Sequence, residues 1–228
     1  EMTQAHGASV VLDGETLVEA QAKAEAIARD RGLTWVHPYD DALVIAGQGT
    51  IAREMLEDVA DLDTLVIPIG GGGLIAGNAI AARAITPAID IVGAEAELYP
   101  SFWNALNGEQ RLFGGPTLAE GIAVKNAGKL ALPIVRELVS EIVLVDEQSI
   151  ERAVNAYLTL QKTMAEGAGA AGLAAMLRKP ESFRGRKDGS DEFDTIRPRE
   201  VLDFQERVAD VAFTLDFPIP PNIDATEA

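Results

Sequence analysis

The sequence contains no cysteine and few aromatic residues, which make up 5% of its 228 positions. The absence of cysteine excludes disulfide bonds, thiolate catalysis, iron–sulfur clusters and cysteine-ligated zinc. The two histidines, His6 and His37, lie far apart in the sequence and form no paired metal-ligand motif. With so few aromatic rings, small aliphatic side chains must fill most of the hydrophobic core.

Basic residues are also scarce, because 19 Lys and Arg stand against 36 Asp and Glu, a formal net charge of −17. Nucleic-acid binding requires a basic surface, and the sequence has no basic run, so we expect no nucleic-acid partner. No apolar run approaches the roughly 18 residues of a membrane-spanning helix, and no signal segment follows Met2. We therefore expect no membrane partner and a cytoplasmic location.

One stretch near the middle of the chain predicts the fold class. Leu65–Ile69 is a continuous apolar run, typical of a strand buried on both faces of a parallel sheet. An alanine-rich helix from Leu74 to Ile85 follows, and then a second buried strand, Ile89–Ala94, which ends at Glu95. This βαβ unit predicts an α/β fold with a mostly parallel sheet and helices on both faces.

Periodicity and turn signals predict further elements on both sides of this unit. We expect helices at 15–31, 50–60, 130–139, 147–164 (with Asp146 as N-cap) and 170–177. We expect short strands at 34–36 and 142–145, and 8–12 is a short apolar run that ends at the turn pair Asp13-Gly14. The composition changes at Pro180, where a charged and proline-containing tail begins.

Four consecutive glycines, Gly70–Gly73, join the first strand of the βαβ unit to its helix. Glycine lets the backbone adopt positive φ and approach a ligand closely. The first amides of the following helix have no acceptor within the helix, and the helix dipole favours an anion there. A phosphate-binding loop is therefore the better interpretation than a flexible linker or a tight turn.

The loop pattern alone leaves the phosphate compound open. Gly71-x-Gly73-x-x-Ala76 satisfies the dinucleotide pattern, and Glu95 lies near the position of a ribose-binding acid. A dinucleotide-dependent oxidoreductase is thus one hypothesis. A Walker loop fits less well, because no Gly-Lys-Ser/Thr follows.

Five ordered blocks, taken together, are far more specific than the glycine loop. The sequence contains His37-Pro38-Tyr39-Asp40-Asp41, Ala46-Gly47-Gln48-Gly49-Thr50, Pro68-Ile69-Gly70-Gly71-Gly72-Gly73-Leu74, Leu118-Ala119-Glu120-Gly121-Ile122-Ala123-Val124 and Glu166-Gly167-Ala168-Gly169-Ala170-Ala171-Gly172. In this order they resemble the threonine dehydratase (threonine ammonia-lyase) and serine racemase family of fold-type II pyridoxal-phosphate enzymes. The resemblance covers about residues 1–187 and outweighs the dinucleotide pattern.

The resemblance implies a cofactor, a site and a reaction. The cofactor is pyridoxal 5'-phosphate, with its phosphate held by Gly70, Gly71, Gly72, Gly73 and Leu74 and its ring near Gly121. Glu166 is expected near the pocket, although Glu120 and Glu166 could equally be carboxylates that serve a helix start. The reaction is conversion of L-threonine to 2-oxobutanoate and ammonia, or of L-serine to pyruvate and ammonia, and the family's metabolic context includes isoleucine biosynthesis.

A divalent cation site is a weaker implication of the same resemblance. The matching positions are Glu95, Tyr99 and Ser101, and Ser101 stands where a carboxylate is expected. That leaves a poorer set of oxygen ligands for Mg²⁺ or another divalent cation. A locally hydrogen-bonded Glu95 is the alternative.

Two family blocks are missing from this sequence. The family's imine-forming lysine lies in a Ser-x-Lys-x-Arg-Gly-Ala block, and none of the six lysines, Lys23, Lys125, Lys129, Lys162, Lys179 and Lys187, lies in such a block. The substrate-contacting Ser-Ala-Gly-Asn-His block is absent too. We therefore expect no catalytic residue in this chain and no dehydratase activity from it alone.

The resemblance and the two missing blocks also predict the domain organisation. Residues 1–187 are expected to form a partial pyridoxal-phosphate-dependent catalytic domain, truncated at its N-terminus, and 188–228 a divergent tail of uncertain order, which a frameshift could explain. The chain is then either a dehydratase that a second chain completes by supplying the lysine, or a non-catalytic phosphate-binding remnant. We expect it to assemble either with such a lysine-bearing chain or with further copies of itself as a homo-oligomer. An amino acid is the expected substrate, with threonine or serine, and dehydratase or racemase, left open.

Overall fold

The computed structural model describes residues 2–15, 17–59 and 62–183. They form two compact units, one ending at His37 and the other beginning at Pro38, and each is described by itself. The first unit contains helices α1 (Met2–Ala5) and α2 (Leu17–Arg31). The expected strand at 34–36 is wrong, because the structure gives these residues no regular secondary structure. The predicted tail at 188–228 lies outside the described residues.

The second unit is built on a parallel sheet, which confirms the predicted fold class. Its strands β1 (Thr64–Ile69), β2 (Asp90–Ala96) and β3 (Glu141–Val145) lie in the order β1-β2-β3. Both pairings are parallel, with Ile69 opposite Glu95 and Glu95 opposite Leu144. All three strands therefore end at the same edge of the sheet.

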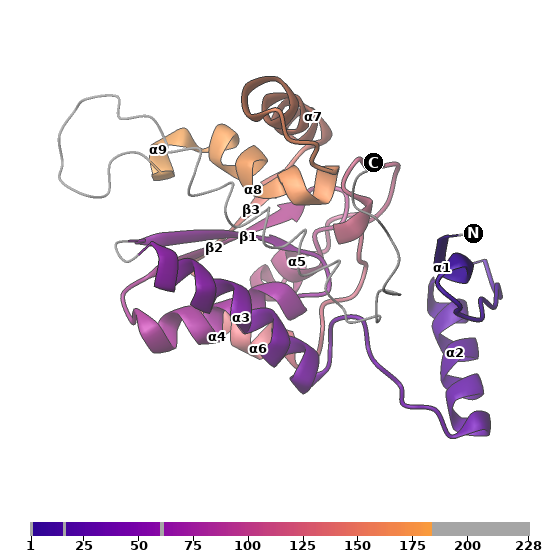
Figure 1. Cartoon of the computed structure of the whole chain (residues 1–228). Coiled ribbons are helices and arrows are strands. Elements are labelled where there is room, and N and C mark those ends of the chain that lie inside the picture. The colour runs from indigo at the N-terminus through magenta and orange to yellow at the C-terminus, as the bar shows by residue number, and fades with distance from the viewer. Residues whose placement is uncertain (1, 16, 60–61, 184–228) are drawn as a thin grey trace, which may run out of the picture. The chain divides into compact units, whose positions relative to one another are not determined.

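Helices cover both faces of this sheet (Figure 1). α3 (Ala42–Asp58), α4 (Gly73–Ile85) and α6 (Ala131–Leu138) lie on one face, and α7 (Glu147–Ala156) and α8 (Gly167–Arg178) on the other. The remaining helical elements are α5 (Ser101–Asn107), the 3-10 turn η1 (Glu120–Ile122), the π turn η2 (Tyr157–Gln161) and α9 (Pro180–Phe183). In the part of the chain that the structure describes, no helix is both long and apolar enough to cross a bilayer.

Two helical elements differ from the sequence expectation. The α-helix expected at 147–164 ends at Ala156 and continues as η2, because the Tyr157 carbonyl accepts hydrogen bonds from the amides of Lys162 and Thr163. Lys162 itself adopts a left-handed conformation, with φ of 61°. Helix α5 was missed altogether, because it spans only 7 residues.

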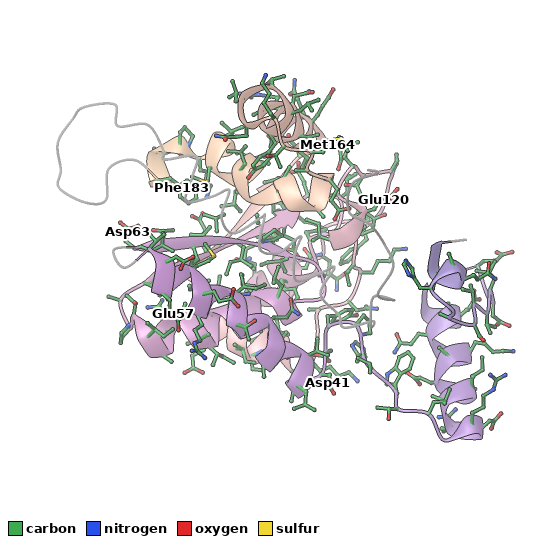
Figure 2. The ribbon with its side chains drawn as sticks, in the orientation of Figure 1. Asp41, Glu57, Asp63, Glu120, Met164 and Phe183 are labelled. Carbon is green, nitrogen blue, oxygen red and sulfur yellow. The ribbon has the colours of Figure 1, made fainter. Side chains whose placement is uncertain are left out.

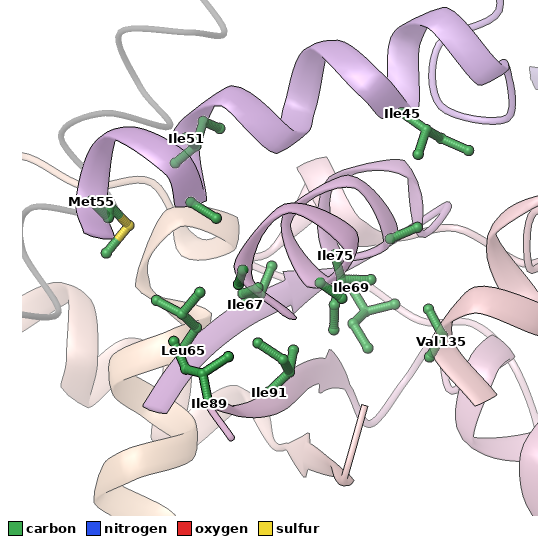
Figure 3. Close-up of a cluster of buried hydrophobic side chains, with 14 of the residues drawn as sticks. Ile45, Ile51, Met55, Leu65, Ile67, Ile69, Ile75, Ile89, Ile91 and Val135 are labelled. Atoms are coloured by element: carbon green, nitrogen blue, oxygen red, sulfur yellow. The ribbon is translucent and has the colours of Figure 1, made fainter. Parts of the chain in front are cut away.

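Each face of the sheet has its own hydrophobic cluster. Figure 3 shows the first, where Ile67 and Ile69 of β1 meet Ile75 of α4, and Ile91 of β2 lies below them. The second cluster lies between the sheet and helices α7 and α8, and alanines make up much of it. Small aliphatic side chains therefore fill the core, as the shortage of aromatic residues predicts.

Helices α3 and α4 approach each other closely at two glycines. A Cβ built on Gly77 would collide with the Ile45 carbonyl oxygen, and one on Gly49 would lie 2.8 Å from the Gly77 carbonyl oxygen. Next to this crossing, the buried Asn78 side chain accepts a hydrogen bond from the Ala52 amide at 2.7 Å. This contact fixes α4, and with it the loop at its N-terminus, against α3.

We predict that Gly77→Ala lowers the free energy of unfolding by about 1–3 kcal/mol, because the added methyl group forces α3 and α4 apart. Gly47→Ala is the matched control, since nothing lies within 4 Å of its Cβ position on α3. The control should raise stability by about 0.5–1 kcal/mol through helix propensity. Urea unfolding followed by circular dichroism measures both, and equal stability of the two variants would contradict the close crossing.

Candidate functional site

The candidate site lies at the edge of the sheet where the three strands end. β1 leads into the glycine loop and α4, β2 leads through residues 97–100 into α5, and β3 leads directly into α7. In open parallel sheets this edge is where ligands bind. The loops that follow the strands therefore hold the residues of interest.

The glycine loop presents backbone amides at the start of α4. Gly72 precedes the helix with φ of +91° and supplies no side-chain cap. The first hydrogen bond of α4 runs from the Ala76 amide to the Gly72 carbonyl oxygen at 3.0 Å. The amides of Gly73, Leu74 and Ile75 therefore have no acceptor within the helix. Such a donor set suits a phosphate group.

The structure brings three of the predicted site segments together. A Cβ on Gly70 would lie 3.0 Å from the Cα of Ile122 and 3.5 Å from the Gly121 carbonyl oxygen. A Cβ on Gly121 would lie 3.3 Å from Oε1 of Glu166. Gly70, Gly121 and Glu166 thus meet from β1, η1 and the start of α8. Glu120, labelled in Figure 2, is exposed at the start of η1.

Protein carboxylates cap the helices that follow β2 and β3. The Glu95 carboxylate accepts hydrogen bonds from the Phe102 amide at 2.8 Å and the Trp103 amide at 2.9 Å, at the start of α5. Asp146 accepts one from the Ser149 amide at 2.7 Å, as its predicted N-cap role requires. That hydrogen bond also holds the pKa of Asp146 below its usual range. Within the described part of the chain, no such carboxylate caps α4, which follows β1.

Glu95 is completely buried, and its environment bears on the two ligand-binding roles considered for it. Burial raises the pKa of its carboxyl group to about 7, although the hydrogen bonds from Phe102, Trp103 and Ser101 act in the opposite direction. Ser101 donates its hydroxyl to Glu95 Oε1 at 3.2 Å. A carboxylate held in this way cannot reach a nucleotide ribose, so the dinucleotide hypothesis loses its acidic residue.

The second residue predicted as a cation ligand is engaged elsewhere. The Tyr99 hydroxyl donates a hydrogen bond to the Gly115 carbonyl oxygen at 2.9 Å. Among the described residues, no three His, Asp or Glu side chains gather in a way that could hold a metal ion. Glu95 is instead a buried cap of α5, which was the alternative interpretation of the sequence.

The lysines of the described segments lie on the surface or pair with acidic groups. Lys23 pairs with Asp13, and Lys179 pairs with Glu141. The Lys162 ammonium group donates to the Thr159 carbonyl oxygen at 2.8 Å. The side chains of Lys125 and Lys129 are exposed, and Lys187 lies outside the described residues.

Sequence reasoning missed the contribution of Tyr39, Asp40 and Asp41, which it used only as part of the family resemblance. Asp41 lies at the start of α3 (Figure 2) and caps it, accepting hydrogen bonds from the amides of residues 43 and 44. Asp40 caps α6 instead, and the ring of Tyr39 packs on Gly71 of the glycine loop. Burial raises the pKa of Tyr39, and the charge of Asp40 raises it further. The aspartate pair was the available signal, but we expected this helix to begin at residue 50 and therefore predicted neither aspartate as its cap, whereas α3 begins at Ala42.

We predict that Glu95→Gln changes how stability depends on pH. The folded-state pKa is about 7 and the ordinary value is 4.5, so stability from the protonated Glu95 is fully present below about pH 4.5 and is lost as pH rises through about 7. Relative to the glutamine variant, the wild-type chain should lose as much as about 3 kcal/mol between pH 4.5 and 8. Urea unfolding at pH 5 and pH 8 measures this difference, and parallel pH profiles would contradict it.

Comparison with known proteins gives this site a family. The sequence profile of the family "Pyridoxal-phosphate dependent enzyme" matches residues 1–188. The L-threonine ammonia-lyases of Thermotoga maritima and Geobacter sulfurreducens are 43% and 46% identical to the chain, over 79% and 78% of its length. Among solved structures, a threonine deaminase from T.th. superposes with a TM-score of 0.73 at 34% identity, covering 78% of this chain and 60% of that one.

Maize serine racemase superposes with a TM-score of 0.72 at 33% identity, covering 76% of this chain and 55% of that one. The chain spans about half the length of the curated relatives it matches, 45% and 44% for the two ammonia-lyases. The resemblance to threonine dehydratases and serine racemases, inferred from five short blocks, is thereby confirmed. The chain belongs to the family of pyridoxal-phosphate dependent enzymes.

Proposed function

We propose that the chain holds the phosphate group of pyridoxal 5'-phosphate at Gly70–Leu74, as part of an L-threonine or L-serine dehydratase (ammonia-lyase). The observation that carries the proposal is the contrast among the three helices that follow the strands. α5 receives the Glu95 carboxylate and α7 receives Asp146, whereas α4 has no side-chain cap. A bound phosphate would complete the start of α4 in the same way.

The residues around the loop fit such a group. The amides of Gly73, Leu74 and Ile75 supply donors, and the loop glycines lie close enough to η1 for Gly121 to border the same space. When bound, pyridoxal phosphate supplies an electron sink for the electrons left by loss of a substrate α-proton. The part of this chain is to bind the phosphate and orient it through backbone donors, and Glu166 beside Gly121 adds a carboxylate at the border of the site.

The proposed activity belongs to the family reaction, in which L-threonine gives 2-oxobutanoate and ammonia, or L-serine gives pyruvate and ammonia. None of the described lysines lies in the family's imine-forming block, so we assign none of them the role of moving the α-proton. That observation favours a second candidate function, a non-catalytic binder of pyridoxal phosphate or another anion. The two candidates share the same phosphate site and differ in whether a second chain supplies the lysine.

Several finer expectations remain part of this proposal. We propose that residues 1–187 belong to one catalytic domain, that the protein is cytoplasmic, and that it assembles with a further copy or with a lysine-bearing chain. A divalent cation at Glu95 and Tyr99 also remains a prediction. It would require Glu95 to exchange the amides of Phe102 and Trp103 for the cation. A role in isoleucine biosynthesis follows only if threonine is the substrate.

Titration of the purified chain with pyridoxal 5'-phosphate tests the phosphate site. We expect a saturable change in absorbance that inorganic phosphate reverses by competition. Pyridoxal, which lacks the phosphate, is the matched control and should bind at least about tenfold more weakly, because it cannot reach the loop amides. Borohydride reduction followed by mass spectrometry should show no single dominant labelled lysine.

Two outcomes of this titration would change the conclusion. Equal affinity for pyridoxal phosphate and pyridoxal would contradict a phosphate site at α4. A stoichiometric imine on one lysine would contradict the absence of an imine-forming lysine and would make catalysis by this chain possible. Binding of NADH, with no binding of pyridoxal phosphate, would support the oxidoreductase hypothesis instead.

A further inference from the structure

Tyr39 lies directly on the glycine loop. A Cβ built on Gly71 would collide with the ring of Tyr39, and one on Gly73 would collide with the Tyr39 carbonyl oxygen. The loop and Tyr39 are therefore in van der Waals contact at two of the four glycines. The next residue, Asp40, connects the loop to a third part of the chain.

The Asp40 carboxylate caps α6 across a separation of 89 to 91 residues. It accepts hydrogen bonds from the Lys129 amide at 2.8 Å, the Leu130 amide at 2.9 Å and, more weakly, the Ala131 amide at 3.4 Å. Gly128 packs against the same carboxylate, since its Cβ would lie 2.6 Å from Asp40 Oδ1. Asp40 thus fixes the position of Gly128 and of the amides that follow it.

Gly128 in turn holds the peptide group between Gly71 and Gly72. Its amide donates a hydrogen bond to the Gly71 carbonyl oxygen at 3.1 Å. No peptide bond of the described chain is cis, and in a trans peptide the carbonyl and the next N–H point in opposite directions. Holding the Gly71 carbonyl toward Gly128 therefore directs the Gly72 N–H away from Gly128.

We propose that Asp40 is a positioning residue for anion binding at the glycine loop. It touches no ligand; it orders Gly128, which orients the Gly71–Gly72 peptide, so that the Gly72 N–H joins the amides of Gly73, Leu74 and Ile75 as a preset donor for the anion. A donor held in place before binding loses less conformational freedom when the anion arrives, which strengthens binding. This inference rests on the proposed phosphate site and names a residue that controls it.

The chain supplies a matched control in the adjacent residue. Asp41 is also an aspartate that caps a helix, accepting hydrogen bonds from the Leu43 amide at 2.8 Å and the Val44 amide at 3.1 Å. Its helix is α3, and its hydrogen bonds do not lead to the Gly71 carbonyl. Removal of either carboxylate should cost the stability of one helix cap, but only removal of Asp40 should free the loop peptide.

The test compares Asp40→Ala, Asp40→Asn and Asp41→Ala in the full chain, using pyridoxal 5'-phosphate and inorganic phosphate as probes. Asp40→Ala should weaken the affinity for both probes by about tenfold. Asp40→Asn keeps one acceptor oxygen for the amides of Leu130 and Ala131, so it should recover part of that loss. Asp41→Ala should bind both probes as the wild-type chain does. Urea unfolding should show similar losses of stability for the two alanine variants.

Gly128→Ala tests the same connection from Asp40 to the Gly71 carbonyl, by a change at Gly128 instead of at Asp40. A Cβ on Gly128 would crowd both Asp40 Oδ1 and the Gly71 carbonyl oxygen, at 2.6 and 2.7 Å, so Gly128→Ala should weaken phosphate binding as Asp40→Ala does. In the absence of ligand, amide hydrogen exchange of residues 70–74 should rise in Asp40→Ala and Gly128→Ala but not in Asp41→Ala. A structural role limited to capping α6 would leave this exchange unchanged.

Each outcome separates the inference from the proposed function. If the wild-type chain binds neither probe, the proposed phosphate site fails, and the positioning role fails with it. If the wild-type chain binds and Asp40→Ala binds equally well, the positioning role alone is overturned. Equal weakening by Asp40→Ala and Asp41→Ala also overturns it, because the effect would then follow from general loss of stability.

Discussion

Helices leave the amides of their first turn without acceptors, and at one edge of a parallel sheet several helices begin close together. In this protein, carboxylates supply acceptors for most of these helix starts. Glu95 caps α5, Asp146 caps α7, Asp41 caps α3 and Asp40 caps α6. α4 begins at a glycine without a side-chain acceptor. Among the described helices that follow a strand, α4 is therefore the one that begins without a carboxylate cap.

The rest of the second unit keeps that helix start in a fixed place. α4 is held against α3 at Gly77 and Gly49, where the two backbones approach too closely for a Cβ, and through the Asn78 side chain. Ile75 of α4 packs on β1 in the core shown in Figure 3. Backbone donors can bind an anion well only when such packing prevents them from turning away.

Glu95 shows how burial can redirect a residue that the sequence places at a functional position. Its position near the end of β2 suits a ribose-binding acid or a cation ligand equally well. The structure instead buries it, which raises the pKa of its carboxyl group to about 7. The amides of Phe102 and Trp103 donate hydrogen bonds to this carboxyl group and act in the opposite direction. A ligand could reach this carboxylate only by replacing the amides of Phe102 and Trp103.

The sequence by itself determined the βαβ unit, the position of the glycine loop and the family. Apolar runs such as Leu65–Ile69, helix periodicity and glycine runs are local signals, and the five blocks lie in a fixed order. It also placed Asp146 as a cap, because that residue lies next to its helix. Only the tertiary structure decided that 34–36 forms no strand, that Glu95 faces α5 and that Asp40 reaches α6 across 89 residues. Those outcomes depend on contacts between segments that lie far apart in the sequence, and a local pattern of side chains does not reveal such contacts.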